Sequence, residues 1–114
     1  MDCIFCQIAN KEIPVELLHE DDLVVAFRDI KPIAPVHILV IPKAHIASVN
    51  EIKDEALAGR LIMVAKKLAG DLGIADDGYK LLLRVGRHGG QEVLHVHLHL
   101  LGGAKLAEGI KPLN

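Results

Sequence analysis

The sequence predicts an α+β domain with about five mostly antiparallel strands, one long helix and one short N-terminal helix. Three observations predict this fold class. Several short apolar runs are bounded by turn-forming residues, as strands are. One longer stretch, residues 54–72, has apolar residues at helical spacing. Hydrophobic residues make up 51% of the 114 residues, which is enough for one packed core, so we expect a single domain over residues 1–114.

The elements are expected in the following order. Asp2 caps a short helix over residues 3–9. Gly73 ends the long helix over residues 54–72. Strands are expected where β-branched residues and leucines cluster between turn-forming residues, at 15–19, 23–27, 36–41, 79–85 and 94–101. The tail at residues 104–114 has little pattern.

The long helix has a wider apolar side than a helix that covers one sheet requires. Placed at about 100° per residue, its apolar residues span an arc of about 160°. They are Leu57, Ala58, Leu61, Ile62, Val64, Ala65, Leu68, Ala69 and Leu72. The excess predicts a second partner surface, and a homodimer is the simplest partner. The alternative is a helix half sunk in its own domain.

Charge and apolar patterning exclude several partners. The formal net charge is −2 with acidic and basic residues interspersed, so we expect no nucleic acid partner. Apolar runs such as residues 38–41 are far too short to span a bilayer, and the N-terminus lacks the pattern of a secretory signal. We therefore expect a cytoplasmic protein with no membrane partner.

The most informative segment alternates histidines with aliphatic residues before residue 101. In an extended strand, successive side chains point to opposite faces of the sheet. One face then carries His95, His97 and His99, and the other carries Leu94, Val96, Leu98 and Leu100. A row of three histidines is hard to explain as purely structural. Two chemistries suit it: ligation of a metal ion, or nucleophilic attack by a neutral imidazole on phosphorus.

A glycine-rich loop at residues 86–91 precedes the histidine strand. Its three glycines permit positive φ angles and leave backbone N–H groups uncovered, so the loop can form a nest for phosphate oxygens. The alternative is an ordinary connection between two strands. Because the loop ends just before the histidines, its amides and the imidazoles can converge. The combination is more specific than either part.

These residues resemble the histidine triad (HIT) family. Residues 95–101, His-Val-His-Leu-His-Leu-Leu, fit its signature of three histidines that alternate with apolar residues. Further blocks resemble the family along most of the chain, at residues 4–5, 12–14, 27–30, 34–37 and 41–46. Residues 89–91 and 101–103 are similar to the histidine triad nucleotide-binding (HINT) branch. The resemblance implies a HIT-like fold.

The resemblance also implies an activity, that of a purine nucleoside phosphoramidase or a close relative. Such an enzyme cleaves adenylyl–amine bonds through a nucleotidyl-histidine and releases AMP, with no catalytic cofactor. By this resemblance, His97 attacks the α-phosphorus and His99 contacts the phosphoryl or leaving-group oxygen. His37 and the backbone of His95 help to orient the nucleophile. An imidazole suits this role because it is neutral as it approaches an anion.

A nucleotide-binding site follows from the same resemblance. Asp29 would accept hydrogen bonds from the ribose hydroxyls, although an Asp before a proline-containing loop can also cap a turn. The apolar slot for the base would consist of Phe5, Ile8, Ile13, Phe27 and Ile30, each of which can equally be a core residue. The residues expected near the phosphate are Arg84, Gly90, Gln91, Glu92 and Val93.

Two of these positions depart from the HINT pattern. Arg84 stands where the branch commonly has Asn, and Glu92 stands where a Ser commonly follows Gly-Gly-Gln. Arg84 can replace the lost contact with a charge-assisted hydrogen bond. Glu92 would repel phosphate unless Arg84, Arg87 or Lys80 pairs with it. The leaving-group preference and the turnover rate depend on these two residues.

Cys3 and Cys6 have the spacing of a metal chelate or a redox pair. Many bacterial relatives carry this pair and bind a structural zinc ion, and the matching further ligands are His45 and His95. The resemblance therefore implies a closed Cys₂His₂ site that attaches the N-terminal helix to the sheet and activates no water. The alternative is two cysteines that pack in a short helix.

Three functions remain open. The first is the phosphoramidase. The second is another HIT activity, either dinucleoside polyphosphate hydrolysis or nucleotidyl transfer, although the glycine-containing blocks favour the HINT branch. The third is a nucleotide-binding protein with little turnover, which Arg84 and Glu92 make conceivable. His19 and His88 receive no role in any of them.

Overall fold

A computed structural model describes residues 3–113 of the chain. In chain order, its elements are α1 (Ile4–Ala9), β1 (His19–Glu20), β2 (Val24–Arg28), β3 (Val36–Pro42), the 3-10 helix η1 (Val49–Glu51), α2 (Glu55–Asp71), β4 (Tyr79–Leu83) and β5 (Leu98–Gly102). The five strands form one sheet in the order β1-β2-β3-β5-β4, and every neighbouring pair is antiparallel. The predicted α+β fold with a long and a short helix is confirmed.

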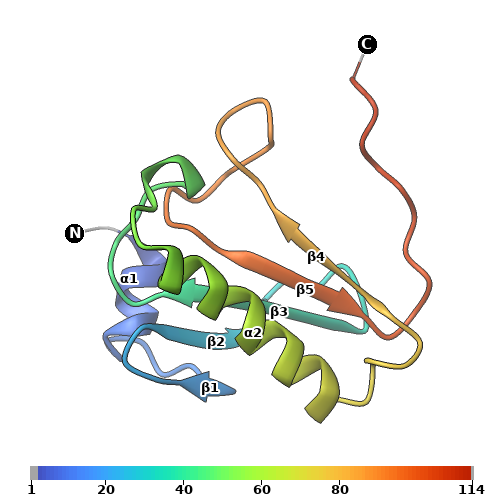
Figure 1. Ribbon diagram of the computed structural model, residues 1–114, viewed down its shortest axis with the longest axis horizontal. Helices are drawn as coiled ribbons and strands as arrows, with labels where there is room; N and C mark the ends of the chain where they lie inside the picture. Colours follow the sequence, from blue (N-terminus) through green and yellow to red (C-terminus); the bar gives the residue numbers. More distant parts are fainter. Residues whose placement is uncertain (1–2, 114) are drawn as a thin grey trace.

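Each face of the sheet carries its own apolar core. α2 lies across one face (Figure 1), where its buried side chains meet those of β2, β3 and β5. The residues of this first core include Val24, Ala26, Ile38, Val40, Leu61, Val64, Leu68, Val96, Leu98 and Leu100. On the opposite face, α1 packs against the alternate residues of β2 and β3. This second core consists of Phe5, Ile8, Ala9, Val25, Phe27, Leu39 and Ile41. The strand alternation therefore separates a helix-covered face from a face that α1 covers only in part.

The long helix α2 begins and ends as its sequence predicts. Asp54 is the N-cap, and its Oδ1 accepts a hydrogen bond of 2.9 Å from the Ala56 N–H. Gly73 follows the helix with a φ of 73°, a conformation that favours glycine. No helix in the described residues is both long and apolar enough to cross a bilayer.

Two strand boundaries were predicted wrongly, and both errors have the same cause. The strand expected at residues 15–19 pairs only at His19 and Glu20, because the register would place Leu17 opposite Arg28, where β2 ends. The strand expected at residues 94–101 begins at Leu98, where its pairing with β3 and β4 begins. A strand extends only as far as its partners do.

The ends of two further elements also differ from expectation. Leu94, which was expected to face the core, is 63% exposed because it precedes β5. β4 ends at Leu83 and not at residue 85. The N-cap of α1 is Cys3, whose Sγ accepts a hydrogen bond from the Cys6 N–H, whereas the predicted cap Asp2 lies outside the described residues.

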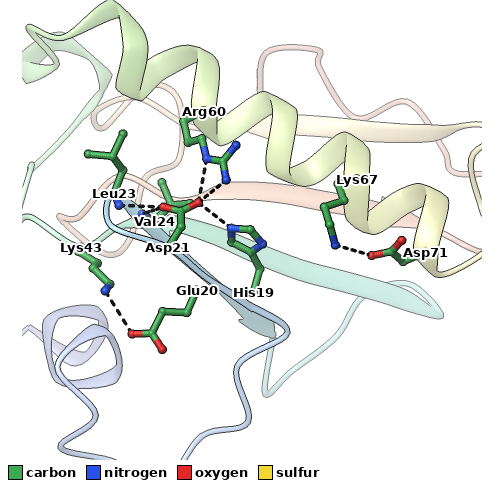
Figure 2. A network of polar contacts seen from close by, with 9 residues as sticks. All are labelled: His19, Glu20, Asp21, Leu23, Val24, Lys43, Arg60, Lys67 and Asp71. Atoms are coloured by element: carbon green, nitrogen blue, oxygen red, sulfur yellow. Dashed lines mark hydrogen bonds and ion pairs between the residues drawn. The ribbon is translucent and has the colours of Figure 1, made fainter.

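One carboxylate joins the β1–β2 turn to α2 (Figure 2). Asp21 accepts hydrogen bonds from the backbone N–H groups of Leu23 and Val24 at 2.8 and 2.9 Å. Its Oδ2 lies 2.7 Å from His19 Nε2 and accepts a 2.8 Å bond from Arg60 Nε on α2. Burial alone would raise the pKa of Asp21, but these donors hold it well below its usual range.

We expect Asp21→Ala to lower the free energy of unfolding by about 2 kcal/mol at pH 7, because it leaves several donors without their acceptor. A depressed folded-state pKa gives stability that is complete above the unfolded-state value of about 4 and is lost as the pH falls through the folded-state value. The difference between the two proteins should therefore shrink in acid. Urea unfolding at pH 7 and pH 3 measures it.

Asp71→Ala is the matched control, because Asp71 pairs at 2.8 Å only with the exposed Lys67 on the same helix (Figure 2). Exposed pairs of this kind contribute little. Equal losses in the two variants would show that Asp21 does not join the turn to α2.

Candidate active site

The histidines gather on the face of the sheet that α1 partly covers. His37, His95, His97 and His99 are 5%, 0%, 9% and 7% exposed. The register pairs Leu39 of β3 with His99 of β5, so His37 and His99 lie on neighbouring strands and on the same face. His97 and His99 point away from the α2 core, which takes Val96 and Leu98 instead. Four imidazoles thus line one largely buried region.

The ring of His97 has a defined tautomer. Its Nδ1 lies 2.7 Å from the backbone oxygen of His95. A carbonyl oxygen can only accept a hydrogen bond, so Nδ1 carries the proton and Nε2 carries the lone pair. The Phe5 and His99 rings each lie 5.0 Å from the His97 ring, centroid to centroid, and pack against it. His97 is thereby arranged as a nucleophile through Nε2.

A second chain of hydrogen bonds determines the tautomer of His99. The Ile33 N–H donates to His37 Nδ1 at 3.2 Å, so the proton of neutral His37 lies on Nε2. That Nε2–H donates to His99 Nδ1 at 2.9 Å, which leaves the proton of His99 on its own Nε2. His99 Nε2 is buried and has no hydrogen-bond partner among the described residues. A buried donor without an acceptor, beside the nucleophile, is suited to a phosphoryl oxygen or a leaving atom.

Burial keeps these two histidines neutral. It lowers the pKa of His99 to about 4, and the positive charges that His97, His37 and Arg84 can carry act in the same direction. Burial also lowers the pKa of His37, although the carboxylate of Asp29 opposes this effect. Near neutral pH, His99 therefore acts as a neutral hydrogen-bond donor.

Asp29 lies beside this chain of hydrogen bonds at the end of β2. One of its carboxylate oxygens accepts a 2.8 Å bond from the Lys31 N–H, and the other lies 3.4 Å from His37 Nε2. The side chain caps the loop and is still 20% exposed. The turn-capping and ligand-binding interpretations of Asp29 are therefore compatible.

The structure brings most of the expected base-binding residues together. Phe5, Ile8 and Phe27 are buried in the second core, and Ile13 and Val93 pack against its edge. Ile30 is the exception in this group. It is 93% exposed in the loop that follows β2.

The glycine-rich loop differs from the expected phosphate nest. The N–H groups of Gly86, Gly90 and Gln91 donate within the loop, to Gln91 Oε1, the Arg87 oxygen and the Gly86 oxygen. The Gln91 side chain also donates 2.7 and 3.0 Å bonds to the backbone oxygens of Ala47 and Val93. Gln91 therefore braces the loop.

The two amides that follow the glycine-rich loop are further candidates for a phosphate contact. Within residues 3–113, the N–H groups of Glu92 and Val93 donate no hydrogen bond. The Glu92 side chain is exposed and lines a hollow of about 490 Å³ together with Cys3, Ile4, His45, Val93 and Leu94. Among the described residues, Glu92 forms no ion pair with Arg84, Arg87 or Lys80.

A second cluster of side chains is suited to a metal ion. Ligand atoms of Cys3, Cys6, His45 and His95 all lie within 4.8 Å of one another. The Sγ–Nδ1 distances are 3.3 Å for Cys3–His95 and Cys6–His45, and 3.5 Å for Cys6–His95. A tetrahedral zinc ion separates its sulfur and nitrogen ligands by about 3.6 Å. His95 Nε2 lies 2.9 Å from the Pro42 oxygen, so the proton is there and Nδ1 can ligate.

Asp29, His37 and His99 also bring ligand atoms within 4.8 Å of one another. A metal ion at His37 Nε2 would move the ring proton to Nδ1, where the Ile33 N–H already donates. Two donors would then face each other at 3.2 Å. The geometry favours the hydrogen bonds over a metal ion.

Sequence reasoning missed the backbone groups that set these tautomers. The amide of Ile33 and the oxygen of Pro42 each determine the state of a histidine ring. Backbone groups carry no residue-type signal. Only Pro42, directly after a predicted strand, marked a place where the chain turns beside the site.

The chain matches known proteins over most of its length. A family model described as HIT domain matches residues 10–106. A purine nucleoside phosphoramidase of Escherichia coli (strain K12) is 52% identical over 107 residues, covering 92% of this chain and 90% of that protein. A HIT family hydrolase from Legionella pneumophila superposes with a TM-score of 0.88 at 48% identity, covering 93% of this chain and 96% of the other. A histidine triad protein from Clostridium difficile gives 0.91 at 45%, covering 96% of each chain.

Fold, site and relatives together define a small α+β hydrolase with a row of histidines on one face of its sheet. The chain belongs to the HIT family, as its sequence motifs predict.

Proposed function

We propose that this protein is a purine nucleoside phosphoramidase, which cleaves the bond between an adenylyl phosphorus and an amine and releases AMP. One observation carries the proposal: the His95 oxygen holds the Nδ1–H of His97, so that Nε2 presents its lone pair. The neutral donor of His99 lies on the adjacent ring, 5.0 Å away. The name of the E. coli relative supports the same reaction here.

The reaction proceeds in two displacements at phosphorus. His97 Nε2 attacks the α-phosphorus, the P–N bond to the amine breaks, and the amine leaves after taking up a proton from solvent water. Water then attacks the phosphorus of the nucleotidyl-histidine and gives up a proton to solvent, the P–Nε2 bond breaks to return neutral His97, and AMP leaves. His99 Nε2–H stabilises the charge that develops on the oxygens in both steps, which a donor in a dry site does effectively.

The remaining residues bind the nucleotide. Asp29, whose side chain is 20% exposed, accepts hydrogen bonds from the ribose hydroxyls. The base lies against the apolar residues Phe5, Ile8, Ile13 and Phe27, with Ile30 at the rim. The amides of Glu92 and Val93 contact the phosphate, Arg84 lies beside it next to the glycine-rich loop, and Gly90 and Gln91 give that loop its shape.

The test is a comparison of two substrates. The protein is incubated with adenosine 5′-phosphoramidate and with diadenosine tetraphosphate, and AMP is measured by chromatography. We expect the phosphoramidate to be hydrolysed with the higher kcat/KM. Preference for the dinucleotide would favour the second HIT activity. Binding of AMP with no hydrolysis of either compound would favour a nucleotide-binding protein.

We also propose that Cys3, Cys6, His45 and His95 hold a structural zinc ion. The donor set and its spacing fit a closed tetrahedral site. When bound, the ion supplies a rigid cross-link and no Lewis acid for the substrate. His95 belongs to both sites, since its ring is a ligand and its backbone oxygen orients His97.

Protein prepared without chelator should contain one zinc ion per chain by elemental analysis. Cys3→Ser should lose the ion and unfold at a lower temperature, because metal binding contributes to folding. His88→Ala should retain it, since His88 is an exposed residue of the glycine-rich loop. Wild-type protein that is folded but contains almost no zinc would contradict the proposed zinc site.

A homodimer is the third part of the proposal. Ile62 and Met63 of α2 are 48% and 53% exposed, and Leu81 and Leu83 of the edge strand β4 are 37% and 38% exposed. The register places Leu81 and Leu83 on the α2 side of the sheet. A second copy can cover this apolar surface with the same surface of its own.

Light scattering should give twice the chain mass of 12.4 kDa at micromolar concentration. Met63→Glu should give the monomer mass, because it places a charge in the interface and disturbs no core residue. A wild-type monomer would contradict the proposal.

A further inference from the structure

Arg84 lies next to the proposed nucleophile. The pairing of β4 with β5 ends with Leu82 opposite His99 and Leu83 opposite Leu98, so Arg84 directly follows β4 at the end of the sheet where His97 directly precedes β5. Continuing the alternation of β4 by one residue puts Arg84 on the face of Leu82 and His99, and the charge of Arg84 does act on the pKa of His99. Its Cδ and Nε lie within 3.5 and 3.6 Å of the point where a Cβ on Gly90 would stand. The guanidinium therefore lies between the glycine-rich loop and the histidines.

The positive charge of Arg84 has no counter-ion among the residues that the structure describes. The side chain is half-buried, and within residues 3–113 it forms neither an ion pair nor a hydrogen bond. The guanidinium charge is close enough to act on the histidines. Together with burial, it lowers the pKa of both His37 and His99. A half-buried cation without a carboxylate partner is costly unless a ligand supplies the anion.

The order of the strands indicates which part of a bound substrate would face Arg84. The proposed nucleoside contacts, Asp29 and Phe27, belong to the β2 side of the sheet, and His97 precedes β5. Arg84 follows β4, on the far side of His97 from the nucleoside. In a displacement at phosphorus, the amine lies opposite the attacking Nε2, and the Arg84 side of the site is not occupied by the ribose. A substituent on the amine can extend toward Arg84.

We propose that Arg84 selects substrates whose leaving amine carries a carboxylate, that is, adenylyl phosphoramidates of α-amino acids. The inference rests on the proposed function and adds its substrate class. The α-phosphate already has neutral donors in His99 Nε2–H and in the amides of Glu92 and Val93. The guanidinium is then available for a second anion, and its fork matches a carboxylate in two parallel hydrogen bonds.

The test compares adenosine 5′-phosphoramidate of glycine with its glycinamide analogue, in which the carboxylate is replaced by a neutral amide. We expect Arg84→Gln to lower the ratio of kcat/KM values, carboxylate over amide, about tenfold, as loss of one charge-assisted contact does. The comparison between proteins cancels the difference in amine basicity. Arg84→Lys should give an intermediate ratio, and Arg87→Gln, a change of an exposed arginine in the same loop, should leave the ratio as in wild type.

A binding measurement separates this inference from the proposed function. In a His97→Ala background, calorimetry should show that the carboxylate compound binds about tenfold more tightly than the amide and that Arg84→Gln removes the difference. If wild type hydrolyses neither compound but the binding difference is present, the phosphoramidase is wrong and the carboxylate site stands. If Arg84→Gln weakens the binding of both compounds equally, Arg84 contacts only the phosphate that they share, and the inference is overturned. If Arg84→Gln proves unfolded in a melting experiment, Arg84→Lys replaces it. An equal change in the affinity of Arg84→Lys for the two compounds then overturns the inference as well.

Discussion

His97→Ala is expected to reduce the hydrolysis of adenosine 5′-phosphoramidate by at least about 10,000-fold. Removal of the nucleophile leaves only binding and charge stabilisation, and enzymes with covalent intermediates lose rates of this size when the attacking group is removed. The affinity for AMP should change by less than about threefold, because the ring acts on phosphorus and contributes little to ground-state binding. Single-turnover kinetics and calorimetry measure the two effects separately.

His88→Ala is the matched control. It makes the same chemical change at an exposed histidine of the glycine-rich loop, and the rate should stay close to that of wild type. A His97→Ala protein that keeps more than about a tenth of the wild-type rate would exclude His97 as the nucleophile.

Gly89→Ala should have the second largest effect, with a loss of about 100-fold in kcat/KM. A Cβ at this position would lie 2.5 Å from the backbone oxygen of Val85 and 2.7 Å from its nitrogen. Backbone atoms cannot yield as a flexible side chain can, so the loop must move. This movement would displace Arg84 together with the amides of Glu92 and Val93. Loss of one aligned hydrogen-bond donor to a transition state lowers the rate by about 100-fold or more. Steady-state kinetics measures the effect.

Gly70→Ala distinguishes a loop effect from a general cost of the methyl group. A Cβ on Gly70 in α2 meets nothing within 4 Å. The variant should retain full activity and become more stable by up to about 1 kcal/mol, since alanine favours a helix. Normal activity of Gly89→Ala would mean that the loop does not position the phosphate contacts.

Patterns that depend on local periodicity were predicted well. α2 was found from its 3.6-residue repeat and its terminal Gly73, which both act locally, and the structure adds Asp54 as its N-cap. β3 was found because its apolar run is buried on both faces of the sheet. The ends of β1 and β5 were predicted wrongly, because the length of a strand depends on partners that are distant in sequence.

The site was predictable in its side chains and not in its backbone. The alternation of residues 95–99 correctly placed His97 and His99 opposite the α2 core. The amides expected to hold phosphate at Gly90 and Gln91 are used inside the loop, because the Gln91 side chain bridges it. Ile30 is exposed although its type suggests burial. The roles of the site residues, the single domain over residues 1–114 and the cytoplasmic location stay predictions.

The most direct measurement of the central claim is mass spectrometry of protein quenched in alkali during turnover of adenosine 5′-phosphoramidate. Alkali is chosen because a phosphorus–imidazole bond is labile in acid. We predict an adenylyl group on the peptide that contains residues 95–99, with fragmentation assigning it to His97. An adduct on any other side chain, or complete turnover with no adduct in wild-type protein at any quench time, would contradict the mechanism.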